Sequence, residues 1–154
     1  MKKLFALLLA LTMIFALAAC GGGKSGSLAW PGISYLQGSD KYTGDGKITY
    51  VKEWTASAEY EKWTIFYEGA TFESVESYVA GLVNTGWENN WADEESDYAQ
   101  AKTDEGIARG YYCTSDYAEI EIQITDYTLE HEFSDEVPFT YNLRIDISKT
   151  YAAL

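Results

Sequence analysis

The chain has few of the residues that most often carry metal and nucleophilic chemistry. Among its 154 residues there is one histidine, His131, and there are two cysteines, Cys20 and Cys113. A zinc site needs several Cys or His ligands at regular spacing, and no such set exists here. His131 stands between Glu130 and Glu132, and we expect it to be a solvated loop histidine. Cys113 lies in a strand-like run, which predicts a packed core cysteine rather than a nucleophile.

Basic residues are also scarce. The chain has 11 Lys and Arg against 24 Asp and Glu, a formal net charge of −13 at pH 7. This balance counts against nucleic acid as a partner, because that binding depends on Lys and Arg neutralising phosphates. It also counts against electrostatic adhesion to anionic lipid. We interpret the charge as a solubility feature; the alternative is a cation-rich partner or a divalent metal.

No apolar run is long enough to suit a permanent transmembrane helix. Lys2 and Lys3 are followed by the uncharged run from Leu4 to Ala19. Sixteen helical residues span roughly 24 Å, less than the hydrocarbon core of about 30 Å. A basic start, an apolar run and small residues before a cleavage site are typical of a signal peptide.

The end of this run resembles a bacterial lipobox. The residues are Leu17-Ala18-Ala19-Cys20, and a tether of glycine, serine and lysine follows from Gly21 to Ser27. The resemblance implies cleavage between Ala19 and Cys20, with lipid attached to the Cys20 sulfur. It predicts a signal peptide over 1–19, a lipidated tether over 20–29 and one domain over 30–154, anchored at the extracytoplasmic face of the cell membrane. The alternative is an ordinary secretory signal that leaves Cys20 as a free thiol.

The predicted domain opens with a hairpin and continues into one helix. Alternation over 48–54 and 62–67 predicts two paired strands, with Ile48, Tyr50 and Trp54 on one side of the first and Trp63, Ile65 and Tyr67 together on the second. The segment 71–85 has an apolar stripe at helical spacing: Phe72, Val75, Val79, Leu82 and Val83. Thr71 is placed to cap this helix, and Gly86 is placed to end it, with Trp87 contacting Leu82.

The second half of the domain predicts further strands over 98–102, 107–113, 119–125 and 139–149. In the last strand we expect the odd-numbered residues, from Phe139 and Tyr141 to Ile147, to face inward. The segment 127–138 is polar and is predicted to be a loop. The fold class is therefore α+β: an antiparallel sheet of about five or six strands with one α-helix packed on one face.

The order of these features resembles a group of small, uncharacterised lipoproteins of Gram-positive bacteria. The resemblance covers most of the predicted domain and brings no settled activity with it. It rests on Trp30-Pro31, the hairpin, the helix with Tyr78 and Leu82, Gly86-Trp87, Tyr98-Ala99, Gly106-Ile107 and Tyr111.

No catalytic constellation is recognisable, and no cofactor is predicted. The chain lacks a G-x-S-x-G elbow and a glycine-rich phosphate loop, and its many acids offer no way to choose a glycosidase pair. Two acidic clusters are weak calcium candidates, although neither has the EF-hand pattern. One is the segment 130–136, and the other comprises Asp93, Glu94, Glu95 and Asp97.

Aromatic residues are abundant, with five Trp and thirteen Tyr. Trp87 and Trp91 flank Asn89 and Asn90, an arrangement that can hold a sugar ring or a peptide. The alternative, which we favour, is that Trp87 is a helix-stop contact and Trp91 covers the sheet edge. Because no catalytic constellation is recognisable, we predict a binding module, with an envelope protein or glycan as partner. An envelope enzyme acting on polysaccharide or peptide through acidic residues, or an accessory lipoprotein of a transporter, is the alternative.

Overall fold

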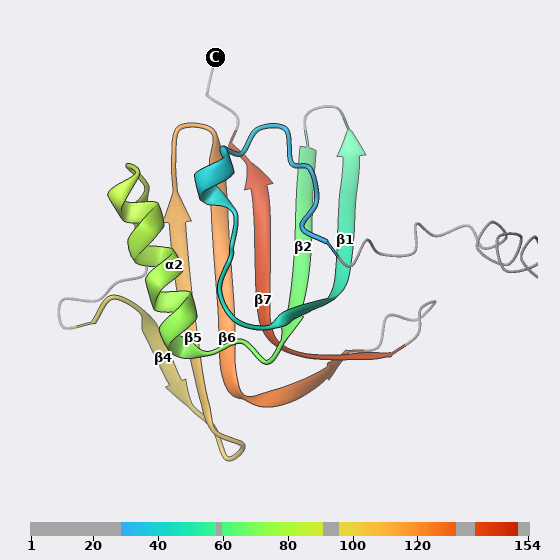
Figure 1. Ribbon diagram of the computed structural model, residues 1–154, viewed down its shortest axis with the longest axis vertical. Coiled ribbons are helices and arrows are strands. Elements are labelled where there is room, and N and C mark those ends of the chain that lie inside the picture. Colours follow the sequence, from blue (N-terminus) through green and yellow to red (C-terminus); the bar gives the residue numbers. More distant parts are fainter. Residues whose placement is uncertain (1–28, 58–59, 91–95, 132–137, 151–154) are drawn as a thin grey trace, which may run out of the picture.

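The computed structural model describes residues 29–57, 60–90, 96–131 and 138–150. It confirms the predicted α+β class: seven strands form one antiparallel sheet, and one α-helix packs against it (Figure 1). The strand order is β1-β2-β7-β6-β5-β3, and β4 also pairs with β5. The elements are η1 (Gly38–Asp40), β1 (Lys47–Ser57), β2 (Tyr60–Glu68), α2 (Phe72–Asn84), β3 (Glu88–Asn89), β4 (Ala99–Lys102), β5 (Ile107–Thr114), β6 (Ala118–His131) and β7 (Phe139–Lys149).

The helix α2 and the segment 29–46, which contains η1, together cover one face of the sheet (Figure 1). Ile33 and Tyr42 from this segment join α2 and the sheet in one core cluster. The sheet contributes alternate residues of β2, β5, β6 and β7, among them the fully buried Ile65, Cys113, Ile120, Ile122, Leu143, Ile145 and Ile147. Each large aliphatic side chain buried in this way contributes about 1.5–3 kcal/mol, so the core requires no disulfide.

The two ends of α2 are fixed by the residues that its sequence predicts. Thr71 Oγ1 accepts a hydrogen bond from the Ser74 amide at 3.2 Å. At the other end Gly86 has a φ of +101°, the left-handed conformation that glycine adopts without strain. The Gly86 amide donates to Val83 O, and the Trp87 amide donates to Leu82 O, both at 3.1 Å. This pair of bonds is a Schellman stop.

The predicted apolar stripe of the helix is wrong at one position. Val83 is 45% exposed, whereas Tyr78 is buried. Val83 lies about 80° around the helix from Val75, at the margin of the stripe. Tyr78 lies on the other flank, toward the segment 29–46, where its hydroxyl donates to Asp40 O at 2.6 Å.

A bulge in β1 corrects the predicted facing of that strand. The pairing with β2 shifts register between Ile48 and Tyr50, so these two residues lie on opposite faces. Ile48 packs against the core, while Tyr50 stacks on Phe139 at 4.6 Å on the other face. Trp54, 41% exposed, shares the face of Tyr50.

The predicted loop over 127–138 is wrong in its first five residues, because β6 continues to His131. The pairing of β6 with β7 shifts register between Ile124 and Leu129, and both strands curve there (Figure 1). His131 is therefore not a solvated loop residue; its half-buried ring stacks on Phe66 at 5.5 Å. Phe139 and Tyr141 also contact Phe66, which lies on the opposite side of β2 from the core residue Ile65, so their predicted inward facing is wrong.

Candidate functional site at the carboxyl end of the helix

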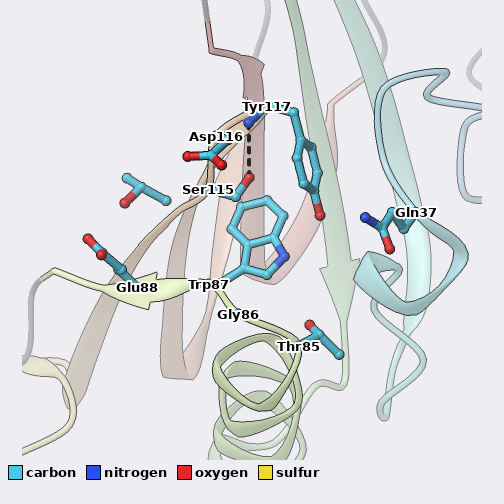
Figure 2. A pocket seen from close by; sticks show the side chains of 9 residues that line it. Gln37, Thr85, Gly86, Trp87, Glu88, Ser115, Asp116 and Tyr117 are labelled. Atoms are coloured by element: carbon cyan, nitrogen blue, oxygen red, sulfur yellow. Dashed lines mark hydrogen bonds between the residues drawn. The ribbon is translucent and has the colours of Figure 1, made fainter. Parts of the chain in front are cut away.

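A pocket opens where α2 ends and three other segments meet (Figure 2). Its volume is about 360 Å³. It is formed by the residue before η1, the end of α2, β3 and the turn between β5 and β6. We name it the end pocket; it is lined by Gln37, Thr85, Gly86, Trp87, Glu88, Thr114, Ser115, Asp116 and Tyr117.

The wall of the end pocket is held by a buried carboxylate, Asp40, which is 1% exposed. Its Oδ1 accepts hydrogen bonds from Trp87 Nε1 and from the Ser39 hydroxyl, both at 3.3 Å. Its Oδ2 accepts from the Gln37 amide at 2.8 Å and from the Tyr117 hydroxyl at 3.0 Å. A single side chain therefore ties η1 to Trp87, which follows the end of α2, and to Tyr117, which directly precedes β6.

The tyrosines around Asp40 remain protonated donors at neutral pH. Burial raises the pKa of Tyr117, and its hydrogen bond to Asp40 acts in the same direction. Burial also holds the pKa of Tyr78 well above its ordinary value of 10.0. Trp87 and Tyr117 meet edge to face, with ring centroids 5.5 Å apart. The wall is thus a fixed aromatic and hydrogen-bonded unit, whose shape exists before any ligand arrives.

The opening of the end pocket is negatively charged. Glu88 and Asp116 are both exposed at its margin (Figure 2), and its lining, as the described residues define it, includes no Lys, Arg or His. The last turn of α2 carries no basic residue, so the negative end of the helix dipole adds to the same field. Such a site favours a ligand that brings hydrogen-bond donors or positive charge.

The hydroxyl groups in the lining of the end pocket already form hydrogen bonds within the domain. Thr85 Oγ1 donates to Leu82 O at 2.9 Å, and Ser115 Oγ accepts from the Ala118 amide at 3.1 Å. The carboxylates of Glu88 and Asp116, the side-chain amide of Gln37 and the exposed backbone are therefore the groups that remain to contact a ligand.

The predicted aromatic platform comprised Trp87, Asn89, Asn90 and Trp91, and the structure describes the first three of these residues. Trp87 is 3% exposed, so its ring is not an open platform on which a ligand could stack. Asn89 Nδ2 donates to Asp97 O, and Asn90 Nδ2 donates to Thr114 Oγ1, both at 2.7 Å. Trp91 lies outside the described residues. The amide side chains thus hold β3 against its neighbours.

The other predicted sites fall largely beyond the described ranges. Ala19, Cys20, Asp93, Glu94 and Glu95 all lie there, while Asp97 is exposed. Within 29–57, 60–90, 96–131 and 138–150, no group of three or more His, Cys, Asp or Glu is placed to hold a metal ion. The same ranges include no helix with the length and apolar character needed to cross a membrane.

Cys113 is fully buried in the core, and burial raises the pKa of its thiol from 9.0 to about 11. It lies opposite Asn89 in the pairing of β3 with β5. Since the thiolate is the reactive form, this cysteine is inert at neutral pH.

Sequence reasoning did not identify Asp40, Tyr78 or Tyr117 as a unit. The one local pattern that could have drawn attention is Gln37 three residues before Asp40, the spacing of a helix-start box. The partners Tyr78, Trp87 and Tyr117 are 38 to 77 residues away along the chain.

Comparison with known proteins adds no family: no protein-family model, curated protein or solved structure matches the chain.

Proposed function

We propose that the chain is a lipid-anchored extracytoplasmic lipoprotein whose domain is a binding module, with its ligand held in the end pocket. The observation that carries the proposal is the preformed pocket, fixed from beneath by Asp40 and charged at its opening by Glu88 and Asp116. A preformed site binds without the entropy cost of ordering its own wall.

The anchor is supported by the N-terminal pattern. Lys2 and Lys3, the apolar run to Ala19 and the lipobox at Cys20 occur in the order that lipid attachment requires. For seven residues of the composition of Gly21 to Ser27, we expect an r.m.s. span of about 15 Å. The lipid would therefore keep the domain near the membrane, while its net negative charge opposes adhesion to anionic lipid.

The charge of the end pocket narrows the ligand class. Two carboxylates and a helix carboxyl end repel phosphate and carboxylate groups. Amine, amide and hydroxyl groups of an envelope peptide or amino sugar suit the site, because each can donate to Glu88 or Asp116.

The test is affinity capture from detergent-solubilised envelope, with glycan-array binding in parallel. The full mature protein is compared with a pocket variant carrying Glu88→Gln and Asp116→Asn. Both side chains are exposed, so the fold is expected to remain intact. The matched control carries Asp104→Asn and Glu105→Gln in the exposed turn between β4 and β5.

We expect the pocket variant to lose at least about tenfold in binding, the change that about 1.4 kcal/mol corresponds to, and the control to bind as the parent does. Equal binding by all three proteins would place the ligand elsewhere. Failure of the parent to bind any envelope component would refute the binding module itself.

A further inference from the structure

The face of the sheet opposite α2 is the open face, and its side chains are ordered by the strand pairing. Across the sheet, one row comprises Lys52, Thr64, Asp146, Glu121 and Tyr112 on β1, β2, β7, β6 and β5. The neighbouring row comprises Trp54, Lys62, Ser148, Glu119 and Thr114 on the same strands. β7 is therefore the middle strand of five.

The middle of the open face is an ion cluster in which one carboxylate, Asp146, lies beside two bases. Asp146 is 4% exposed although it lies on this face. Its Oδ1 accepts from Thr64 Oγ1 at 2.5 Å and lies 3.5 Å from Lys62 Nζ, and its Oδ2 lies 2.7 Å from Arg144 Nη2. Trp54 Nε1 donates to the same Thr64 hydroxyl at 3.1 Å, which holds the indole over the cluster.

The β1–β2 half and the β6 half of the open face differ in charge. Lys52 and Lys62 lie on the β1–β2 half, and Lys52 Nζ lies 4.3 Å above the Trp54 ring. Glu119 and Glu121 lie on the β6 half. In a chain with so few bases, this is a positive half beside a negative half.

The shape of the open face is divided in the same way. On the β2 side, His131, Phe139 and Tyr141 pack on Phe66 and form a ridge from the curved ends of β6 and β7. On the β4–β5 side there is a trough of about 410 Å³, lined in part by Ala99, Ala101, Ala108 and Gly110, with Tyr127 and Tyr141 also in its lining.

A twofold axis running along β7 would bring these halves together. It would exchange β2 with β6 and β1 with β5, so the positive half of one copy would meet the negative half of the other, and each ridge would face a trough. Twofold interfaces use one self-complementary patch on both subunits, and sheets pack face to face with their strands roughly aligned.

We propose that the open face is a self-association surface on which a second copy of this chain packs face to face, with Lys62 of each copy opposite Glu119 of the other. Charge complementarity of the open face with itself favours a second copy as the occupant. The end pocket does not enter this argument, so either proposal can fail while the other stands.

The test is sedimentation velocity of the mature protein in mild detergent, at low and high salt, up to submillimolar concentration. We expect a monomer–dimer equilibrium for the parent. Lys62→Glu and Glu119→Lys are expected each to weaken the homodimer at least tenfold, because like charges then face each other. An equimolar mixture of the two variants is expected to recover the dimer, because both cross-interface pairs again join opposite charges.

Lys41→Glu and Glu105→Lys are the matched controls, since both residues are exposed and neither lies in the two rows of the open face. They should leave the dimer unchanged. Ala101→Trp, at an exposed position in the trough, provides a variant that needs no charge change and is expected to abolish the dimer. A parent that stays monomeric at all concentrations would overturn the proposal. So would a dimer that ignores both the charge variants and Ala101→Trp.

Discussion

Replacing Asp40 with alanine should be among the most damaging single changes in this domain. The substitution removes the acceptor for Trp87 Nε1, a donor on a side chain that is only 3% exposed, and for the hydroxyl of half-buried Tyr117. Leaving a buried donor unsatisfied costs about 1–3 kcal/mol. With the larger share from Trp87 and a smaller one from Tyr117, we expect the free energy of unfolding to fall by about 3 kcal/mol.

The assay is urea unfolding followed by tryptophan fluorescence. With a slope of about 2 kcal/mol per molar, typical of a small protein, the midpoint should fall by about 1.5 M. Ser39→Ala is the matched control, because Ser39 is exposed and donates to the same carboxylate at 3.3 Å. That variant should lose less than about 0.5 kcal/mol. If Asp40→Ala unfolds within about 0.3 M of the parent, Asp40 is not the residue that fixes the wall of the end pocket.

Three further expectations follow from local geometry. Cys113 should resist iodoacetamide in native protein at pH 8 and react fully in urea; labelling of the native state at the unfolded rate would contradict its burial. Burial raises the pKa of Cys113 from 9.0 to about 11 and that of Tyr111 from 10.0 to about 12, so the folded state keeps these protons to higher pH than the unfolded state does. Stability should therefore be level up to about pH 9 and fall toward pH 12, and urea midpoints that are flat across this window would refute it. Thr71→Ala should lower the free energy of unfolding by about 1 kcal/mol, because the helix cap is lost, whereas Thr71→Ser should keep the cap. Gly86→Ala should lower it by a similar amount, because φ at this position is +101°. Thermal unfolding that ranks these variants otherwise would exclude the caps as the cause.

Local sequence rules predicted the elements whose causes are local. β7 has the predicted bounds, 139–149, because strict alternation over eleven residues has one interpretation. The helix ends were predictable from Thr71 and Gly86, since caps depend on neighbouring residues alone.

The wrong predictions concern residues whose position is determined by strand register or by partners distant in the sequence. The bulges after Ile48 and Ile124 change which face later residues occupy, and nothing in the alternation itself marks them. The last residues of β6 were predicted as a loop because they are polar. His131 lies in the strand nevertheless, and its ring stacks on Phe66 of another strand. The candidate site shows the same limit. Trp87 was predicted as a site residue, but Asp40 was not, because the burial of Asp40 depends on three segments that are distant in the sequence.

We propose that this domain works as a binding module held at a membrane by lipid. Intact mass of the protein extracted from membranes tests the anchor most directly. We expect a chain that begins at Cys20, carries diacylglycerol on its thiol and moves to the soluble fraction in a Cys20→Ala variant. A mature chain that begins elsewhere, or that begins at Cys20 with an unmodified thiol, would contradict it.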